Sequence, residues 1–278
     1  MRPPCLVFQA NAAGLANRLR ALVGYQALSE FLELPFYLVW KRNADCNAEF
    51  QELFQTEIQI ARESDVPQSD PNTLVYESLA WFSEIWRERL EGKVPRDEFL
   101  RRVRVHLDRL TPVRSIQERV DSFAAAHGIS GTLGVHIRHT DNVVAYPSLA
   151  GSASYFELDR VSALSGFLQE MDVHAVQRTI LLATDNSRVE QMCARRYGAR
   201  MIRYEKRYFS HTLRTSSVED ALIELLLLGR CEQILGTYYS SFSQLAAIWS
   251  GRPYREMVGT KAETSRFVDK MQSAMRST

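Results

Sequence analysis

The chain lacks the features that mark membrane, disulfide-rich and zinc-binding proteins. Its four cysteines are far apart and form no Cys-x-x-Cys pair, so neither a disulfide framework nor a zinc site is indicated. No apolar run approaches the roughly 20 residues that span a bilayer. The start, from Met1 to Phe8, is too short for a signal-peptide core. We therefore expect a cytoplasmic protein without a transmembrane segment, although a chain trimmed of a membrane anchor would look the same.

An excess of charge of either sign is also lacking. The net charge is +1, which argues against a nucleic-acid partner. Basic runs at 101–104 and 195–196 are therefore interpreted as solvated helix faces or as a docking surface for an anionic acceptor. With 45% hydrophobic and 24% charged residues, the composition is that of an ordinary globular protein.

Several catalytic motifs are missing as well. The chain has no Gly-x-x-x-x-Gly-Lys phosphate loop and no Gly-x-Ser-x-Gly nucleophile elbow. It also has no Asp-x-Asp motif, with which metal-dependent sugar transferases hold a divalent ion on a diphosphate. We expect no metal and no cofactor, so a diphosphate leaving group would be stabilised by arginine and by helix N-termini.

What the sequence does contain is an alternation of short apolar strands with amphipathic helices. This alternation predicts an α/β protein with parallel sheets and helices on both faces. Two such halves would face a cleft, with a boundary near His127 to Gly131 that separates domains 1–128 and 129–278. The expected strands are 6–8, 36–40, 74–76, 133–136, 179–183, 200–203 and 234–235. The main expected helices are 16–31, one after Pro95, one from Pro112, about 155–171, 187–197, 217–228 and one ending near Trp249.

Ligands of parallel sheets bind beyond the carboxyl ends of the strands, so the loops that follow the strands carry the candidate site. The first loop of the C-terminal half follows His136 and contains Arg138 and Asp141. A guanidinium fork fits a phosphate and stays charged at any working pH. A structural ion pair between Arg138 and Asp141 is an equally good interpretation of the spacing.

Two later loops also join a strand to a helix. Thr184-Asp185-Asn186 favours helix capping, by Asp185 or Ser187, over a role in binding. The loop from Gly236 to Ser243 offers more hydroxyl groups than a single cap needs, which favours anion binding at a helix N-terminus. In the N-terminal half, Asn17 and Arg18 lie between a strand and a helix. They could face the cleft, but a position in the first turn of the helix that faces solvent is the simpler interpretation.

Taken together, these loops resemble those of the GT-B fucosyltransferases that use GDP-fucose, which include α1,6-, nodulation and protein O-fucosyltransferases. The segments 14–18, 136–141, 183–185 and 236–243 are similar, in order and spacing, to the family's Gly-x-x-Asn-(Arg/Gln), His-x-Arg-x-x-Asp and two later donor-site motifs. Residues 46–110 match nothing specific.

This resemblance implies two Rossmann-like domains, with the acceptor mainly in the N-terminal one and the donor mainly in the C-terminal one. Arg138 and Asn17 would be catalytic, with Arg138 on the β-phosphate. Glu224 would read guanine where relatives carry Asp, with Asp220 as its competitor. The nucleotide-sugar site implied in this way comprises Gly14, Asn17, His136, Arg138, Asp185, Glu224, Ser240, Ser241 and Phe242.

The expected reaction is inverting, metal-independent transfer of fucose from GDP-fucose to a glycan or protein acceptor. The base stays open between Asp141, Asp185 and a carboxylate of the N-terminal domain. His139 stands where α1,6 enzymes have a second arginine, which puts that linkage in doubt. A transferase using another GDP-sugar would share the guanine and diphosphate contacts. A non-catalytic nucleotide- or glycan-binding protein would share the fold.

Overall fold

A computed structural model describes residues 4–66, 72–138, 164–206, 217–238 and 240–257. The chain divides into two compact units, Met1–Glu118 and Arg119–Thr278. The division falls inside helix α5 (Arg114–His127). Gly128 follows α5 with a left-handed φ of 59°, a conformation that glycine adopts without strain.

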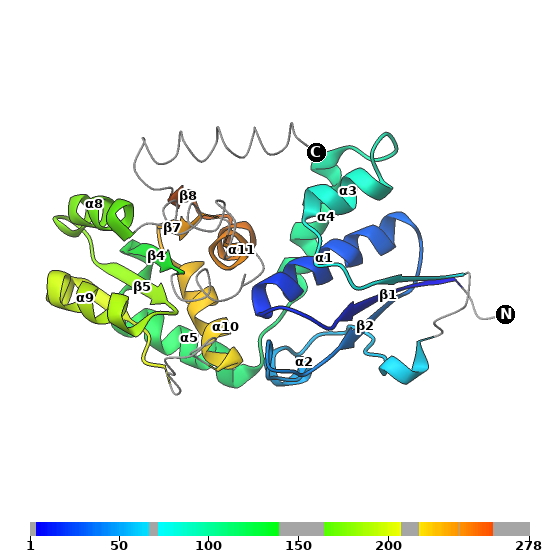
Figure 1. Cartoon of the computed structure of the whole chain (residues 1–278), viewed down its shortest axis with the longest axis horizontal. Helices are drawn as coiled ribbons and strands as arrows, with labels where there is room; N and C mark the ends of the chain where they lie inside the picture. The colour runs from blue at the N-terminus through cyan, green and yellow to red at the C-terminus, as the bar shows by residue number, and fades with distance from the viewer. Residues whose placement is uncertain (1–3, 67–71, 139–163, 207–216, 239, 258–278) are drawn as a thin grey trace, which may run out of the picture. The chain divides into compact units, whose positions relative to one another are not determined.

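The first unit is built around a three-stranded parallel sheet of order β2-β1-β3 (Figure 1). Strand β1 lies in the centre, and Leu6, Phe8 and Ala10 on one of its faces are completely buried. The strands are β1 (Cys5–Ala10), β2 (Phe36–Trp40) and β3 (Thr73–Tyr76), and the helices are α1 (Leu15–Phe31), α2 (Phe50–Leu53), α3 (Phe82–Arg89) and α4 (Arg96–Arg109), with a 3-10 turn η1 (Glu63–Asp65).

The second unit contains a five-stranded parallel sheet of order β6-β5-β4-β7-β8. Its strands are β4 (Leu133–Ile137), β5 (Ile180–Thr184), β6 (Met201–Arg203), β7 (Gln233–Thr237) and β8 (Tyr254–Met257). Its remaining elements are helices α8 (Leu164–Ala175), α9 (Ser187–Tyr197), α10 (Val218–Leu228) and α11 (Ser241–Ser250), with 3-10 turns η2 (Ile129–Gly131) and η3 (Gly198–Arg200).

Helices cover both faces of this second sheet (Figure 1). Alternate residues of β4 point to opposite sides, as the pleat of a strand requires. Val135 packs in one cluster with Phe167 of α8 and Val189 of α9. On the other face, a Cβ added to Gly134 would lie 3.2 Å from Leu228 of α10. The parallel sheet with helices on both faces is therefore as predicted.

Two elements differ from the sequence expectations. Strand β8 was not expected, because only four residues form it and only Met257 among them is buried. The helix expected over about 155–171 is described from Leu164 onward, and its earlier residues lie outside the described part of the chain. None of the described helices is both long and apolar enough to cross a bilayer.

Candidate functional site

The strand order of the second sheet reverses at β4. From β4 the chain moves outward through β5 and β6, then returns to pair β7 on the other side of β4. The carboxyl ends of β4 and β7 are adjacent, with His136 opposite Gly236 in the register. Such a switch point is where ligands of open parallel sheets bind. The structure therefore brings together the loop with Arg138 and the loop with Ser240, which are about a hundred residues apart in sequence.

Two threonines that the sequence analysis did not single out fix the end of β4. Thr237 Oγ1 donates to the His136 carbonyl at 3.0 Å and accepts from the Arg138 N–H at 2.9 Å. Thr184 Oγ1 donates to the Ile137 carbonyl at 2.7 Å. The backbone that carries His136 and Arg138 is thus held from both neighbouring strands. Hydroxyl residues at the carboxyl ends of adjacent strands are the sequence signal for this arrangement.

His136 lies on the face of the sheet that α10 and α11 cover. Its ring stacks on Phe242 of α11, with centroids 4.8 Å apart and planes 28° apart. Burial, together with the nearby charges of Arg138 and Lys206, lowers the pKa of His136 to about 3. The imidazole is therefore neutral at neutral pH. Its Nδ1 is buried and has no hydrogen-bond partner in the described structure.

Helix α11 begins at Ser241, shortly after the end of β7 at Thr237. Ser240 is the N-cap residue, but its side chain makes no capping hydrogen bond. Ser240 is only 1% exposed, and its buried hydroxyl has no hydrogen-bond partner among the described residues. Ser241 is also buried, and the first backbone N–H groups of a helix favour an anion. An unsatisfied buried hydroxyl costs free energy, which a bound ligand at this position would recover.

Glu224 is buried on α10, and a partner holds it there. Its Oε1 lies 2.8 Å from Nζ of Lys206, and the Glu224 side chain is 8% exposed. Burial raises the pKa of Glu224 to about 7, while the Lys206 ammonium acts in the opposite direction. Glu224 is therefore a buried, partnered carboxylate rather than an exposed residue of the helix surface.

Asp220, the competing candidate for guanine recognition, makes contacts of a different kind. Its carboxylate lies 2.7 Å from Arg119 and is fully buried, and its N–H donates to the Ser217 hydroxyl that caps α10. Arg119 also contacts Tyr204 and Glu219. These contacts are those of a residue that anchors α5 against the first turn of α10.

The loop after β5 corrects one detail of the sequence analysis. The N-cap of α9 is Asn186, whose side chain accepts from the N–H groups of Arg188 and Val189. Asp185 and Ser187, the residues expected to cap, flank the actual cap. Asn186 fits because its short carbonyl reaches the second and third N–H groups of the helix. Asp185 is half-buried beside the end of β5. Asp141 and His139 lie outside the described residues, so the Arg138–Asp141 ion pair stays a prediction.

In the first unit, the loop after β1 carries Gly14 and Asn17. Gly14 is the N-cap of α1 and Asn17 lies half-buried in its first turn. The expectation that Arg18 faces solvent is wrong, since Arg18 is fully buried. It donates to the carbonyls of Ala12, Ala13 and Lys41 and to Asn43 Oδ1. Arg18 therefore holds the loop that places Asn17.

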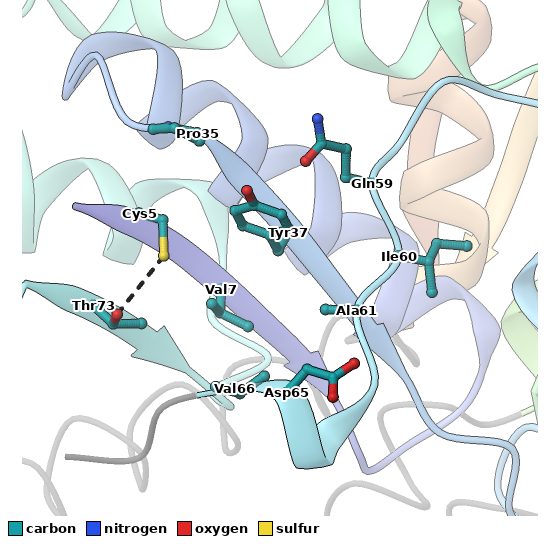
Figure 2. A pocket seen from close by; sticks show the side chains of 10 residues that line it. All are labelled: Cys5, Val7, Pro35, Tyr37, Gln59, Ile60, Ala61, Asp65, Val66 and Thr73. Atoms are coloured by element: carbon teal, nitrogen blue, oxygen red, sulfur yellow. Dashed lines mark hydrogen bonds between the residues drawn. The ribbon is translucent and has the colours of Figure 1, made fainter. Parts of the chain in front are cut away.

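A cavity of about 520 Å³ lies elsewhere in the first unit (Figure 2). It is lined by residues at the amino ends of all three strands, among them Cys5, Tyr37 and Thr73. Cys5 Sγ and Thr73 Oγ1 are 3.7 Å apart across its floor. This cavity is at the sheet edge opposite to the loop with Asn17, so it contains no residue that the sequence analysis selected.

Within the described part of the chain, no three His, Cys, Asp or Glu side chains converge in a group that could hold a metal ion. The described charged groups near the switch point include Arg138, Lys206 and Glu224. Their chemistry suits an anionic ligand that also carries hydrogen-bond donors.

No family model and no curated protein matches the sequence, but solved structures do match the fold. A NodZ α-1,6-fucosyltransferase crystal soaked with GDP-fucose gives a TM-score of 0.57 at 12% identity, covering 89% of this chain and 93% of that one. POFUT1 in complex with GDP gives 0.57 at 14% identity, covering 92% and 99%. FUT1 of Arabidopsis thaliana in complex with GDP gives 0.53 at 10% identity, covering 94% and 72%.

These likenesses extend over most of the chain, at identities of 10–14%. They confirm the predicted fold class: the chain has the α/β, GT-B-like fold of these fucosyltransferases.

Proposed function

We propose that this chain is an inverting, metal-independent glycosyltransferase that transfers fucose from GDP-fucose to a glycan or protein acceptor. The observation that carries the proposal is the buried, unpartnered hydroxyl of Ser240 at the N-terminus of α11, beside the carboxyl end of β4. The fold neighbours support the choice of ligand, since their structures contain GDP-fucose or GDP.

Each candidate residue has a role that its position can serve. Ser240, Ser241 and the N-terminus of α11 bind the diphosphate, together with Arg138. Neutral His136, stacked on Phe242, lies against the nucleotide. The Glu224 carboxylate accepts from guanine N1–H and from its amino group. Asp185, at the end of β5, belongs to the same nucleotide-sugar site, and the roles of Gly14 and Asn17 of the first unit stay predictions.

The chemistry follows from stabilising the leaving group. An acceptor hydroxyl oxygen bonds to the anomeric carbon of fucose while the bond from that carbon to the β-phosphate oxygen breaks. The hydroxyl proton passes to a base, and negative charge develops on the departing GDP. In this proposal Arg138 and the dipole of α11 stabilise that charge, which lowers the barrier.

A donor panel tests the proposal. Release of nucleotide from GDP-fucose, GDP-mannose, UDP-glucose and UDP-N-acetylglucosamine is measured in EDTA, without acceptor, for wild type and for Arg138→Lys. We expect turnover of GDP-fucose, and a roughly 10²-fold lower kcat in Arg138→Lys, because lysine lacks the bidentate fork. Arg42→Lys, which changes an exposed arginine of the first unit, is the control. Preference for a UDP-sugar, strict metal dependence or an unaffected Arg138→Lys would contradict the proposal.

A further inference from the structure

A buried lysine that the sequence analysis passed over lies beside Glu224. Lys206 follows β6, and its side chain is 3% exposed. Its Nζ is 2.8 Å from Oε1 of Glu224 and 3.5 Å from Oε2 of Glu190 on α9. Three elements of the second unit therefore converge on one ammonium group.

The ammonium stays charged in this position. Burial alone would lower the pKa of Lys206, but the carboxylates of Glu224 and Glu190 more than offset it and raise the pKa. Lys206 is also close enough to His136 to lower the pKa of that imidazole. The pair of Lys206 and Glu224 thus belongs to the same sheet edge as the candidate nucleotide site.

The hydrogen-bonding pattern of this pair matches one nucleobase. Guanine presents an acceptor, O6, next to two donors, N1–H and the N2 amino group. Lys206 presents only donors, and the adjacent Glu224 carboxylate presents two acceptors. The donor–acceptor–acceptor order is the one with which cytosine pairs guanine. Adenine would place its N6 donor against the ammonium and its N1 acceptor against the carboxylate.

On the basis of the proposed function, we infer that Lys206 is a specificity-determining residue, which donates a hydrogen bond to guanine O6 while Glu224 accepts from N1–H and N2. A structural role alone is the competing explanation, because removing one partner of a buried ion pair leaves the other uncompensated. The two roles predict different losses when single atoms of the base are changed.

Calorimetric titrations of four nucleotides separate these roles. GDP is compared with 6-thio-GDP, whose sulfur is a weak acceptor at position 6, with IDP, which lacks the N2 amino group, and with ADP. We expect wild type to bind GDP roughly tenfold more tightly than either 6-thio-GDP or IDP. In Lys206→Met the preference over 6-thio-GDP disappears, whereas the preference over IDP remains because Glu224 still reads N2.

The control is Arg203→Met. Arg203 also forms an ion pair with Glu190, at 2.5 Å, but Arg203 is half-exposed. This variant removes a cation from the same cluster and leaves all three preferences unchanged.

Two results would overturn the inference. In the first, Lys206→Met keeps its preference for GDP over 6-thio-GDP and loses its preference over IDP, which is the result for a lysine that only supports Glu224. In the second, wild type prefers GDP to ADP but binds 6-thio-GDP as tightly as GDP. This measurement is made on wild type alone, so it does not depend on the folding of a variant, and its result would leave the proposed function intact. Wild type that binds ADP as tightly as GDP would contradict the proposed function itself.

Discussion

Each unit buries a cation, but the two cations have different surroundings. Arg18 in the first unit donates to three backbone carbonyls and one amide oxygen, which fixes the loop between β1 and α1. Lys206 in the second unit lies against the side-chain carboxylates of Glu224 and Glu190. A cation that satisfies carbonyls of its own loop serves the fold. A cation beside a carboxylate at a sheet's switch point presents a pattern that a ligand can match.

The loops themselves differ in what holds them. Arg18 holds the loop after β1, whereas the hydroxyls of Thr184 and Thr237 hold the end of β4. Buried polar atoms without partners among the described residues occur at both places: Gln9 Nε2 and Asn11 Oδ1 at the first, and His136 Nδ1 and Ser240 Oγ at the second. Buried polar groups are normally satisfied, so at the ends of β4 and β7, where Lys206 and Glu224 also lie, the open groups indicate where a ligand completes the hydrogen bonding. We therefore expect substitutions of Arg18 to reduce the stability of the protein, and substitutions at the ends of β4 and β7 to reduce ligand binding.

The largest stability effect is expected at Arg18. Arg18→Met removes the side-chain donors to the carbonyls of Ala12, Ala13 and Lys41, which should lower the free energy of unfolding by roughly 3–4 kcal/mol. Urea unfolding measures it. Arg42→Met is the matched control, because Arg42 is exposed and its ion pair with Glu52 spans 3.4 Å. Exposed pairs contribute about 0–1 kcal/mol. Equal losses in the two variants would remove the structural role assigned to Arg18.

A smaller effect is expected where α11 packs on β7. A Cβ at Gly236 would lie 2.2 Å from Ser243 Oγ and 2.7 Å from Tyr254, so Gly236→Ala must displace the helix that carries Ser240. We expect a loss of about 1–3 kcal/mol, measured by thermal unfolding. Gly131→Ala serves as control, since a Cβ at Gly131 meets nothing within 4 Å. A Gly236→Ala variant as stable as this control would show that the close approach is not needed.

Acid sensitivity gives the third prediction. The pKa of His136 is about 3 in the folded protein, against an ordinary value of 6.5. Between these values the unfolded chain binds a proton that the folded chain does not, so stability falls as pH drops below 6.5. From pH 6.5 to 5 the contribution of His136 is about 2 kcal/mol.

His136→Phe keeps an aromatic ring and has no proton to bind, so its stability should fall less over the same interval. Glu224 acts in the opposite sense, because its pKa is raised to about 7 and the folded protein holds that proton more tightly. Comparing the two proteins at each pH by urea unfolding cancels the contribution of Glu224. Parallel pH profiles would mean that His136 is not buried in its neutral form.

The sequence predicted the sheets better than the contacts made by single residues. Strand β2 and helix α9 begin and end at the predicted residues, because Pro35 directly precedes the strand, Gly198 directly follows the helix, and the apolar periodicity of each segment is clear. Arg18 was expected to face solvent because a charged residue in the first turn of a helix usually does. Two of the acceptors that bury it, the Lys41 carbonyl and Asn43 Oδ1, come from a segment more than 20 residues away, which the local pattern does not reveal. The role of Lys206 was missed because the carboxylates beside it belong to Glu190 on α9 and Glu224 on α10, and no local sequence spacing connects these residues to Lys206.

The proposed function requires that the carboxyl edge of the second sheet binds a guanine nucleotide without a metal ion. Titration of GDP and ADP, each in EDTA, into wild type and Glu224→Ala is the decisive measurement. We predict that wild type prefers GDP, and that Glu224→Ala loses roughly 1–3 kcal/mol of GDP affinity, because two guanine donors lose their acceptors. ADP affinity should not change, so the preference disappears. Equal binding of both nucleotides by wild type, or an undiminished preference for GDP in Glu224→Ala, would contradict the claim.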